Sequence, residues 1–174
     1  LKDAKEWQNA QEECSEPHSR IVQAPLRSNV TRTHCPGASC WVDAAWKAST
    51  GTCGIGGIFK GPISPPLPLI SFHQRSISSA LMAEAIAVRS AVMTAASSNI
   101  RSLTVLSDSK VLISMVIAKE SRPTLFGILF DIYHFSSVFD SIAFRFVPRL
   151  ENSEADSVAK LALALANIPS SYGV

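Results

Sequence analysis

Hydrophobic residues fall into short runs from about residue 40 and then recur at wider, regular intervals toward the end of the chain. Three apolar runs at 40–47, 53–59 and 69–72 are separated by turn-forming Ser, Thr, Gly and Pro residues. Runs of this length joined by short turns predict three strands in an antiparallel meander. Residues 1–38 are polar, contain Pro and show no period, so we expect a flexible linker there.

After residue 77 the apolar residues change to a helical period. The predicted helices cover 78–98, 109–118, 125–135 and 151–166, and the predicted strands between them cover 102–108 and 142–147. A helical crossover before the fourth strand lets it run parallel to the first. We therefore predict one α/β domain at 39–168, a five-stranded mixed sheet with three antiparallel strands and then two parallel additions, flanked by helices. Residues 169–174 are expected to fray.

A glycine run, Gly54, Gly56 and Gly57, lies in the second predicted strand. A phosphate-binding glycine loop would be followed directly by a helix, whereas this strand continues to Phe59 and then turns. The glycines are therefore interpreted as positions that permit twist or close packing in a hairpin.

Composition and charge exclude few classes of function. The 174 residues are 47% hydrophobic, which excludes wholesale disorder, and a net charge of +2 does not by itself argue for a nucleic-acid partner. The chain shows no signal peptide and no apolar run long enough to span a bilayer, so no membrane association is expected.

Four cysteines occur in the chain: Cys14, Cys35, Cys40 and Cys53. They form no Cys-x-x-Cys pair and indicate no disulfide scaffold, so a reducing intracellular compartment, nucleus or cytoplasm, is expected. His34, Cys35 and Cys40 resemble half of a zinc site. The second ligand pair is missing, however, and Pro36-Gly37 more simply forms a loop turn.

Four acidic residues occupy positions where a charge is unexpected. They are Asp43 in the middle of the first strand, Glu84 on the apolar stripe of the first helix, Asp108 at the end of the fourth strand and Asp156 near the start of the last helix. A carboxylate inside an apolar strand is costly unless a cation, a proton or a metal pairs with it. A parallel arrangement of the first and fourth strands would bring Asp108 beside Asp43.

Three of these acids also have simpler structural explanations. Asp108 is well placed to cap the helix that follows it, and Asp156 near a helix start complements the helix dipole. Glu84 can form an ion pair with Arg89 or Arg101. If the acids instead converge, their mutual repulsion favours hard divalent cations such as Mg²⁺, which take oxygen ligands. Two such ions roughly 3.5–4 Å apart support in-line hydrolysis of a phosphodiester.

Four segments carry a resemblance to a known family: WVDAAWK at 41–47, LMAEAIAVRSAV at 81–92, VLSDSKVLISMV at 105–116 and VPRLENSEADSVAKLAL at 147–163. In this order they resemble ribonuclease H, and most of all the type-1-like domains of plant non-LTR retroelement reverse transcriptases. The resemblance spans 39–168 and implies the ribonuclease H fold. It also implies an endonuclease that hydrolyses the RNA strand of RNA–DNA hybrids with Mg²⁺ or Mn²⁺.

The resemblance further assigns site residues. The family's four metal-binding, catalytic acids correspond to Asp43, Glu84, Asp108 and Asp156. Positions beside these acids, or in the loop before the last one, correspond to the candidate substrate-binding residues Ala44, Ser109, Arg149 and Asn152. The implied partner is an RNA–DNA hybrid, and the domain is expected to be a monomer or part of a larger polyprotein. Candidate contacts to the nucleic-acid backbone are Lys47, Arg75, Arg89, Lys110 and Arg149.

The chain departs from the family at several places, including the following three. Ala44 stands where well-studied relatives have Gly, and residues 78–80 lack the pair of Asn with which relatives grip the RNA strand. No His occurs at 145–156, where relatives often carry a flexible one that assists product release. These departures motivate an alternative function, a nucleic-acid-binding module that is weak or silent as an enzyme. The integrase or transposase branch of the fold is disfavoured because its Glu lies on a late helix.

Overall fold

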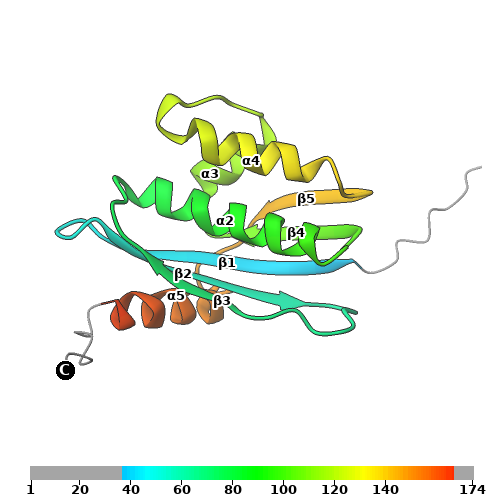
Figure 1. The fold of residues 1–174 in the computed structure, drawn as a ribbon, viewed down its shortest axis with the longest axis horizontal. Coiled ribbons are helices and arrows are strands. Elements are labelled where there is room, and N and C mark those ends of the chain that lie inside the picture. The colour runs from blue at the N-terminus through cyan, green and yellow to red at the C-terminus, as the bar shows by residue number, and fades with distance from the viewer. Residues whose placement is uncertain (1–36, 167–174) are drawn as a thin grey trace, which may run out of the picture. The chain divides into compact units, whose positions relative to one another are not determined.

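A computed structural model describes residues 37–166 of the chain. Most of the expected linker at 1–38, and all of the expected frayed end at 169–174, lie outside this range. Figure 1 shows that the described residues form a twisted sheet with helices on both of its faces.

The sheet has five strands and confirms the predicted topology. The strands are β1 (Ala38–Lys47), β2 (Thr52–Lys60), β3 (Ile70–Gln74), β4 (Ser102–Ser107) and β5 (Ser141–Phe146). Their order across the sheet is β3-β2-β1-β4-β5. The first three strands pair antiparallel, β4 runs parallel to β1, and β5 runs parallel to β4. The sheet is therefore the predicted meander with two parallel additions.

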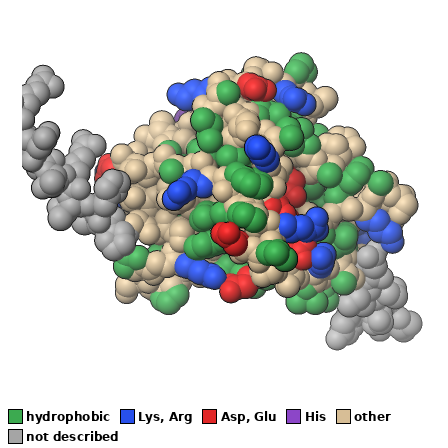
Figure 2. All heavy atoms as spheres, turned by 180° about the vertical axis from the view of Figure 1, so that it is seen from behind, with side chains coloured by type: hydrophobic (Ala, Val, Ile, Leu, Met, Phe, Trp, Pro, Cys, Tyr) green, Lys and Arg blue, Asp and Glu red, His purple; other side chains and the backbone are tan. Residues whose placement is uncertain are grey.

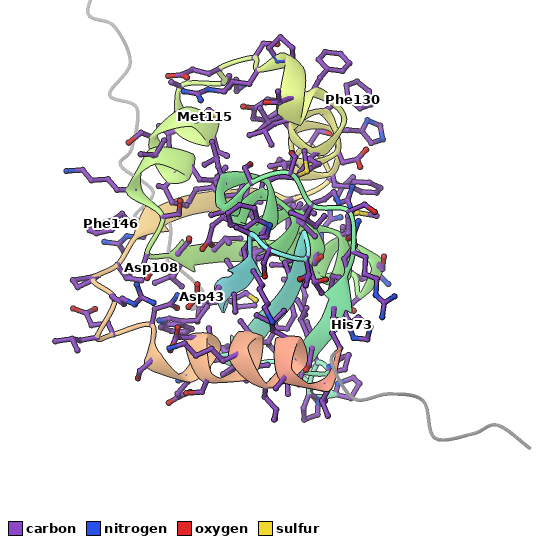
Figure 3. The ribbon with its side chains drawn as sticks, turned by 90° about the vertical axis from the view of Figure 1, so that its left-hand side faces the viewer. Asp43, His73, Asp108, Met115, Phe130 and Phe146 are labelled. Carbon is purple, nitrogen blue, oxygen red and sulfur yellow. The ribbon has the colours of Figure 1, made fainter. Side chains whose placement is uncertain are left out.

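The helices form a layer on each face of this sheet. They are α2 (Ala80–Ser97), α3 (Lys110–Ile117), α4 (Phe126–Ser136) and α5 (Ser153–Leu165), with a short 3-10 helix, η1, at Pro123–Leu125. On one face α2 packs against β1 and β2 and carries α4 on its outer side, while α5 packs against β1, β2 and β3. Figure 3 shows the layers from one end, with α5 on one side of the sheet and the other helices on the opposite side.

The inner face of α2 is built mainly from alanine. Its buried residues are Ala83, Ala85, Ile86, Ala87, Val88, Ala91, Val92 and Ala95. The hydroxyl of Ser79 caps the helix by accepting a hydrogen bond from the amide of Met82 at 3.1 Å. By length and apolar composition alone, α2 is long enough to span a bilayer, so the expectation that no such run exists is wrong. The helix is apolar because one of its faces is buried against the sheet.

The glycine run in β2 is the contact surface for α5. A Cβ atom at Gly54 would fall on the backbone of Ala159, and one at Gly56 would lie 2.6 Å from the amide nitrogen of Ala159. Gly57 differs, because its Cβ would lie 3.0 Å from the Ile70 side chain on the neighbouring strand. The expected close packing within the hairpin therefore applies to Gly57, whereas the other two glycines let α5 rest directly on the strand backbone. This contact sets the position of the helix that carries the last of the four acids.

We predict that Gly56→Ala lowers the free energy of unfolding by about 1–3 kcal/mol, because α5 must move away from β2 to admit the methyl group. Urea unfolding of the two proteins measures the difference. The control is Gly127→Ala on α4, where an added Cβ meets nothing within 4 Å and should raise stability by about 0.5–1 kcal/mol. Unchanged stability of Gly56→Ala would contradict the direct strand–helix contact.

Candidate metal centre

The register of β1 and β4 places Asp43 and Asp108 opposite each other. The last pair of the parallel ladder is Trp41 opposite Leu106. Continuing this register by two residues on each side brings Asp43 opposite Asp108, just beyond the end of the ladder. Figure 3 shows both acids at the same end of the sheet. The sequence-based expectation that parallel pairing brings them together is confirmed.

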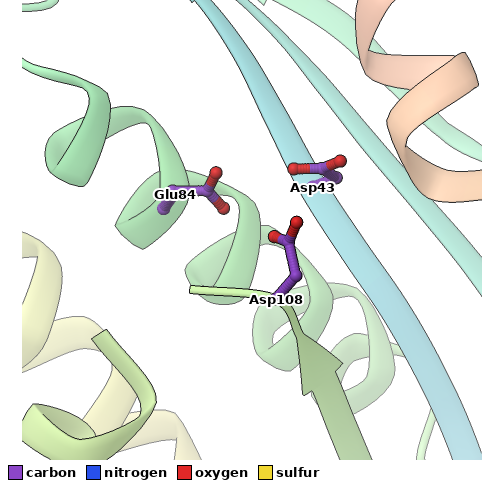
Figure 4. Close-up of side chains that lie close together, drawn as sticks. All are labelled: Asp43, Glu84 and Asp108. Carbon is purple, nitrogen blue, oxygen red and sulfur yellow. The ribbon is translucent and has the colours of Figure 1, made fainter. Parts of the chain in front are cut away.

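The third acid joins them from the opposite layer. Asp43 lies on the face of the sheet that α5 covers, because it pairs with Gly56 across the antiparallel ladder and paired residues point to the same face. Glu84 reaches the same place from α2 on the other face. Figure 4 shows the carboxylates of Asp43, Glu84 and Asp108 gathered together. Each offers an oxygen within 4.8 Å of the others, so this acidic triad could hold a metal ion.

The triad is partly shielded from water, and its charges repel one another unless a proton or a cation balances them. Asp43 is 4% exposed, and Oε2 of Glu84 is buried with no hydrogen-bond partner among the described residues. Burial, together with the charges of Asp43 and Asp108, raises the pKa of Glu84 to about 9. Burial also raises the pKa of Asp43 to about 6, with the charge of Asp108 adding to the effect. The amide of Ala44, which donates to Oδ1 of Asp43 at 2.8 Å, partly opposes this shift.

The ion pair considered for Glu84 is not formed. Arg89 pairs instead with Asp131 at 3.4 Å, and Arg101 pairs with Asp140 at 3.2 Å. Among residues 37–166, no ion pair joins a Lys or Arg to any acid of the triad. The negative charge of the triad is therefore left for a proton or a bound cation to balance.

Asp108 does not cap α3 either. β4 ends at Ser107, so Asp108 stands one residue past the strand, and Ser109 occupies the N-cap position without a side-chain cap. The buried hydroxyl of Ser107 accepts a hydrogen bond from the amide of Ser109 at 3.1 Å and so closes the turn around Asp108. Ser107 was not among the predicted site residues. Its position directly before an acid at a strand end is the signal that would have indicated it.

Asp156 stands apart from the triad. One of its oxygens lies 2.6 Å from Nζ of Lys160, and the other lies 3.6 Å from a guanidinium nitrogen of Arg149. It also lies in the first turn of α5, as the helix-dipole explanation requires. Its charge still acts on the same site, because it contributes to raising the pKa of Asp43. Lys160 was missed by the sequence reasoning, although its spacing of four residues from Asp156 is the usual signal for a helical ion pair.

Asn152 joins α5 to the strand that carries Asp43. Its side chain is completely buried, and its amide donates to the backbone carbonyl of Val42 at 2.9 Å. Val42 is the first residue of β1 beyond the β1–β4 ladder, so Asn152 supplies a donor where β4 no longer pairs. Its predicted contact with substrate stays a prediction, and in this structure its side chain faces the protein interior.

The half zinc site can be assessed only at Cys40, because His34 and Cys35 lie outside the described residues. Cys40 is completely buried in β1, and burial raises the pKa of its thiol to about 12. Because the thiolate is the form that binds zinc, this position is unfavourable for a ligand.

The segment from β1 into α5 matches a known family. The reverse transcriptase-like family matches residues 41–162, a range that contains Asp43, Glu84, Asp108 and Asp156. The chain belongs to the reverse transcriptase-like family. A search of curated proteins gave no match to it.

Solved structures similar to this reverse transcriptase-like chain include several ribonucleases H. The N-terminal RNase H domain of a Mycobacterium tuberculosis protein is 21% identical with a TM-score of 0.66, over 74% of this chain and 94% of that one. RNase H1 from Halobacterium salinarum is 20% identical with a TM-score of 0.61, over 73% and 97%. LC11-RNase H1 from compost, solved with an RNA/DNA hybrid, is 20% identical with a TM-score of 0.61, over 74% and 98%. These similarities confirm the predicted ribonuclease H-like fold.

We predict that the metal-free protein loses stability as the pH rises from about 4 to about 9. Both shifted pKa values, about 6 for Asp43 and about 9 for Glu84, lie above the ordinary 3.8 and 4.5. The folded state then binds protons more tightly than the unfolded state, so this stability is full below the ordinary values and is lost as the pH passes the raised ones. Urea unfolding in EDTA across this range measures the loss.

Glu84→Gln removes the group that titrates last, so we expect a smaller decline above about pH 6. Glu154→Gln is the matched control, because this acid on α5 has a side chain that is 64% exposed and pairs with Lys60 on the surface. Its pH profile should follow that of the wild type. A wild-type profile that is flat, or equal slopes for wild type and Glu84→Gln, would contradict the buried repulsion in the triad.

Replacement of Asn152 by Ala should lower the free energy of unfolding by about 1–3 kcal/mol, because the carbonyl of Val42 loses its buried donor. Ser157→Ala, also on α5, removes an exposed hydroxyl that bonds within its own helix and should change stability by less than about 0.5 kcal/mol. Chemical denaturation compares the two variants. Losses of equal size would show that Asn152 is not a special link between the elements.

Proposed function

We propose that the protein is a divalent-metal-dependent endonuclease that hydrolyses the RNA strand of RNA–DNA hybrids. The observation that carries this proposal is the acidic triad of Asp43, Glu84 and Asp108, with ligand oxygens within 4.8 Å of one another. A fold shared with ribonucleases H adds support. The four motif segments support, in addition, an origin of the domain in a plant retroelement reverse transcriptase.

The donor set suits a hard divalent ion. Carboxylate oxygens are ligands that Mg²⁺ prefers, and the buried Oε2 of Glu84 has no partner among the described residues, so it is available to a cation. We propose Mg²⁺ as the ion, with Mn²⁺ able to replace it. Ions bound by these acids would activate the attacking water and stabilise the leaving oxygen of the phosphodiester, as in two-metal nucleases.

The residues of the chain hold these ligands in place. The amide of Ala44 orients the carboxylate of Asp43, and the turn closed by Ser107 positions Asp108 at the end of β4. Asn152 ties the start of α5 to β1 beside Asp43. Asp156, the fourth proposed ligand, would join once its contacts with protein cations are released.

We propose that the hybrid is bound through its sugar–phosphate backbone and 2′-hydroxyls, because duplexes of A-like form are recognised mainly by shape and by these groups. Arg149 and Lys160 place positive charge beside the site on side chains that are 74% and 60% exposed. Figure 2 shows basic side chains interspersed with acidic and hydrophobic ones on the face that it presents. A surface with this mixture of charges favours a modest affinity for the hybrid. The proposed contacts of Ala44 and Ser109 stay predictions.

A silent nucleic-acid-binding module is the second candidate function. The observation that favours it is the pairing of Asp156 with Lys160 and Arg149. In this structure the fourth acid is engaged with these cations and does not join the triad. Such a module would bind an RNA–DNA hybrid without cutting it, even with Mn²⁺. The same assay separates the two candidates.

We predict that the protein cuts a labelled RNA–DNA hybrid in Mg²⁺ and that EDTA stops the reaction. Asp108→Asn should reduce the rate by at least about 100-fold, because loss of a ligand should cost more than the 10–100-fold typical of groups that merely support ligands. Gel analysis of the cleaved RNA strand measures the rate. Duplex DNA and single-stranded RNA serve as substrates that should remain intact.

Asp131→Asn is the matched control variant, because it removes an acid that pairs with Arg89 outside the triad. It should cut the hybrid at the wild-type rate. Equal cutting by wild type and Asp108→Asn would refute catalysis at the triad. Hybrid binding without any cutting in Mg²⁺ or Mn²⁺ would establish the silent module instead.

A further inference from the structure

We propose that Lys160 and Arg149 are internal counter-ions of Asp156 that compete with a divalent ion for its carboxylate. This inference rests on the proposed function, because it concerns the acid that would complete the same site. These two side chains would control how readily Asp156, the fourth acid, becomes a metal ligand.

The contacts of Asp156 differ from those of the triad. Both of its oxygens face protein cations, Oδ2 at 2.6 Å from Lys160 and Oδ1 at 3.6 Å from Arg149. The described triad acids have no ion pair with a Lys or Arg. An ion can therefore approach the triad without displacing a cation, whereas at Asp156 it must displace at least one.

The two cations are held near Asp156 in different ways. Lys160 lies one helical turn after Asp156 on α5, so the helix keeps the ammonium beside the carboxylate even when the contact breaks. Arg149 precedes α5, and its longer 3.6 Å contact and largely exposed side chain make it the weaker partner. Lys160 should thus be the main competitor, both by occupying the oxygen and by repelling a divalent charge.

The competition creates two classes of metal position. The triad should bind an ion first, and the position that needs Asp156 should bind more weakly. Phosphate groups of a bound nucleic acid can attract the exposed ammonium and guanidinium groups away from Asp156. Nucleic acid and the second ion would then strengthen each other's binding, as thermodynamic linkage requires.

Titration of the full chain with Mn²⁺, without nucleic acid, tests the inference. The free ion is followed by its electron paramagnetic resonance signal, so the readout does not depend on catalysis. Lys160→Met removes the charge and keeps a long side chain on an exposed position. We expect it to tighten the weaker class of Mn²⁺ binding about two- to fivefold, the range that loss of an exposed ion pair allows. A second Mn²⁺ detected only in the variant would support the inference equally.

Lys60→Met is the matched control. Lys60 lies on β2 and pairs at 2.8 Å with Glu154, which is on α5 like Asp156, and it makes no ion pair with Asp156 itself. Its Mn²⁺ binding should equal that of the wild type, and Lys160→Gln should repeat the result of Lys160→Met. Unchanged binding by both Lys160 variants, or an equal gain in Lys60→Met, overturns the inference and leaves the proposed function standing. A wild-type protein that binds no Mn²⁺ at all overturns the proposed function as well.

Discussion

Repulsion among three crowded carboxylates is the constraint on which the rest of the structure depends. The oxygens of Asp43, Glu84 and Asp108 lie within 4.8 Å of one another, and Asp43 and part of Glu84 are shielded from water. Unfolding would separate and hydrate these charges, so the site itself opposes folding when no cation is bound. The alanine-lined contact of α2 and the glycine contact of α5 must therefore supply stability that the site does not.

The same two contacts also explain how acids from both layers can meet. Gly54 and Gly56 let α5 approach the backbone of β2, and the small inner residues of α2 let that helix lie close to β1 and β2. Beyond Trp41 the strands β1 and β4 no longer pair, so the sheet does not separate the two layers there. This close packing of the helices on the sheet brings Glu84 to the carboxylates of Asp43 and Asp108.

The sequence predicted most features of the fold that follow from the spacing of apolar residues and from the connections between strands. The spacing of apolar residues indicated each described strand, and the crossover through α2 indicated that Asp108 would lie beside Asp43. The partner of Gly54 and Gly56 was not predictable from the strand alone, because it lies about 100 residues away on α5. The pairing of Asp156 with Lys160 was also missed. The spacing of four residues on α5 allows this pair, but such a pair stabilises a helix by only about 0.2–0.5 kcal/mol, so the spacing does not decide whether it forms.

The distribution of the arginines completes the argument for an external cation. Arg89 lies on the same helix as Glu84 but pairs with Asp131 on α4, and Arg101 pairs with Asp140 before β5. Both cations could have balanced a buried acid, and both are instead engaged with acids that are more exposed. A fold selected only for stability would pair or remove an uncompensated carboxylate such as Glu84, because leaving it buried costs several kcal/mol or more. The charge of Glu84 and of the two acids beside it is left for a proton or a bound cation to balance, and the oxygens of the triad lie close enough to hold a metal ion.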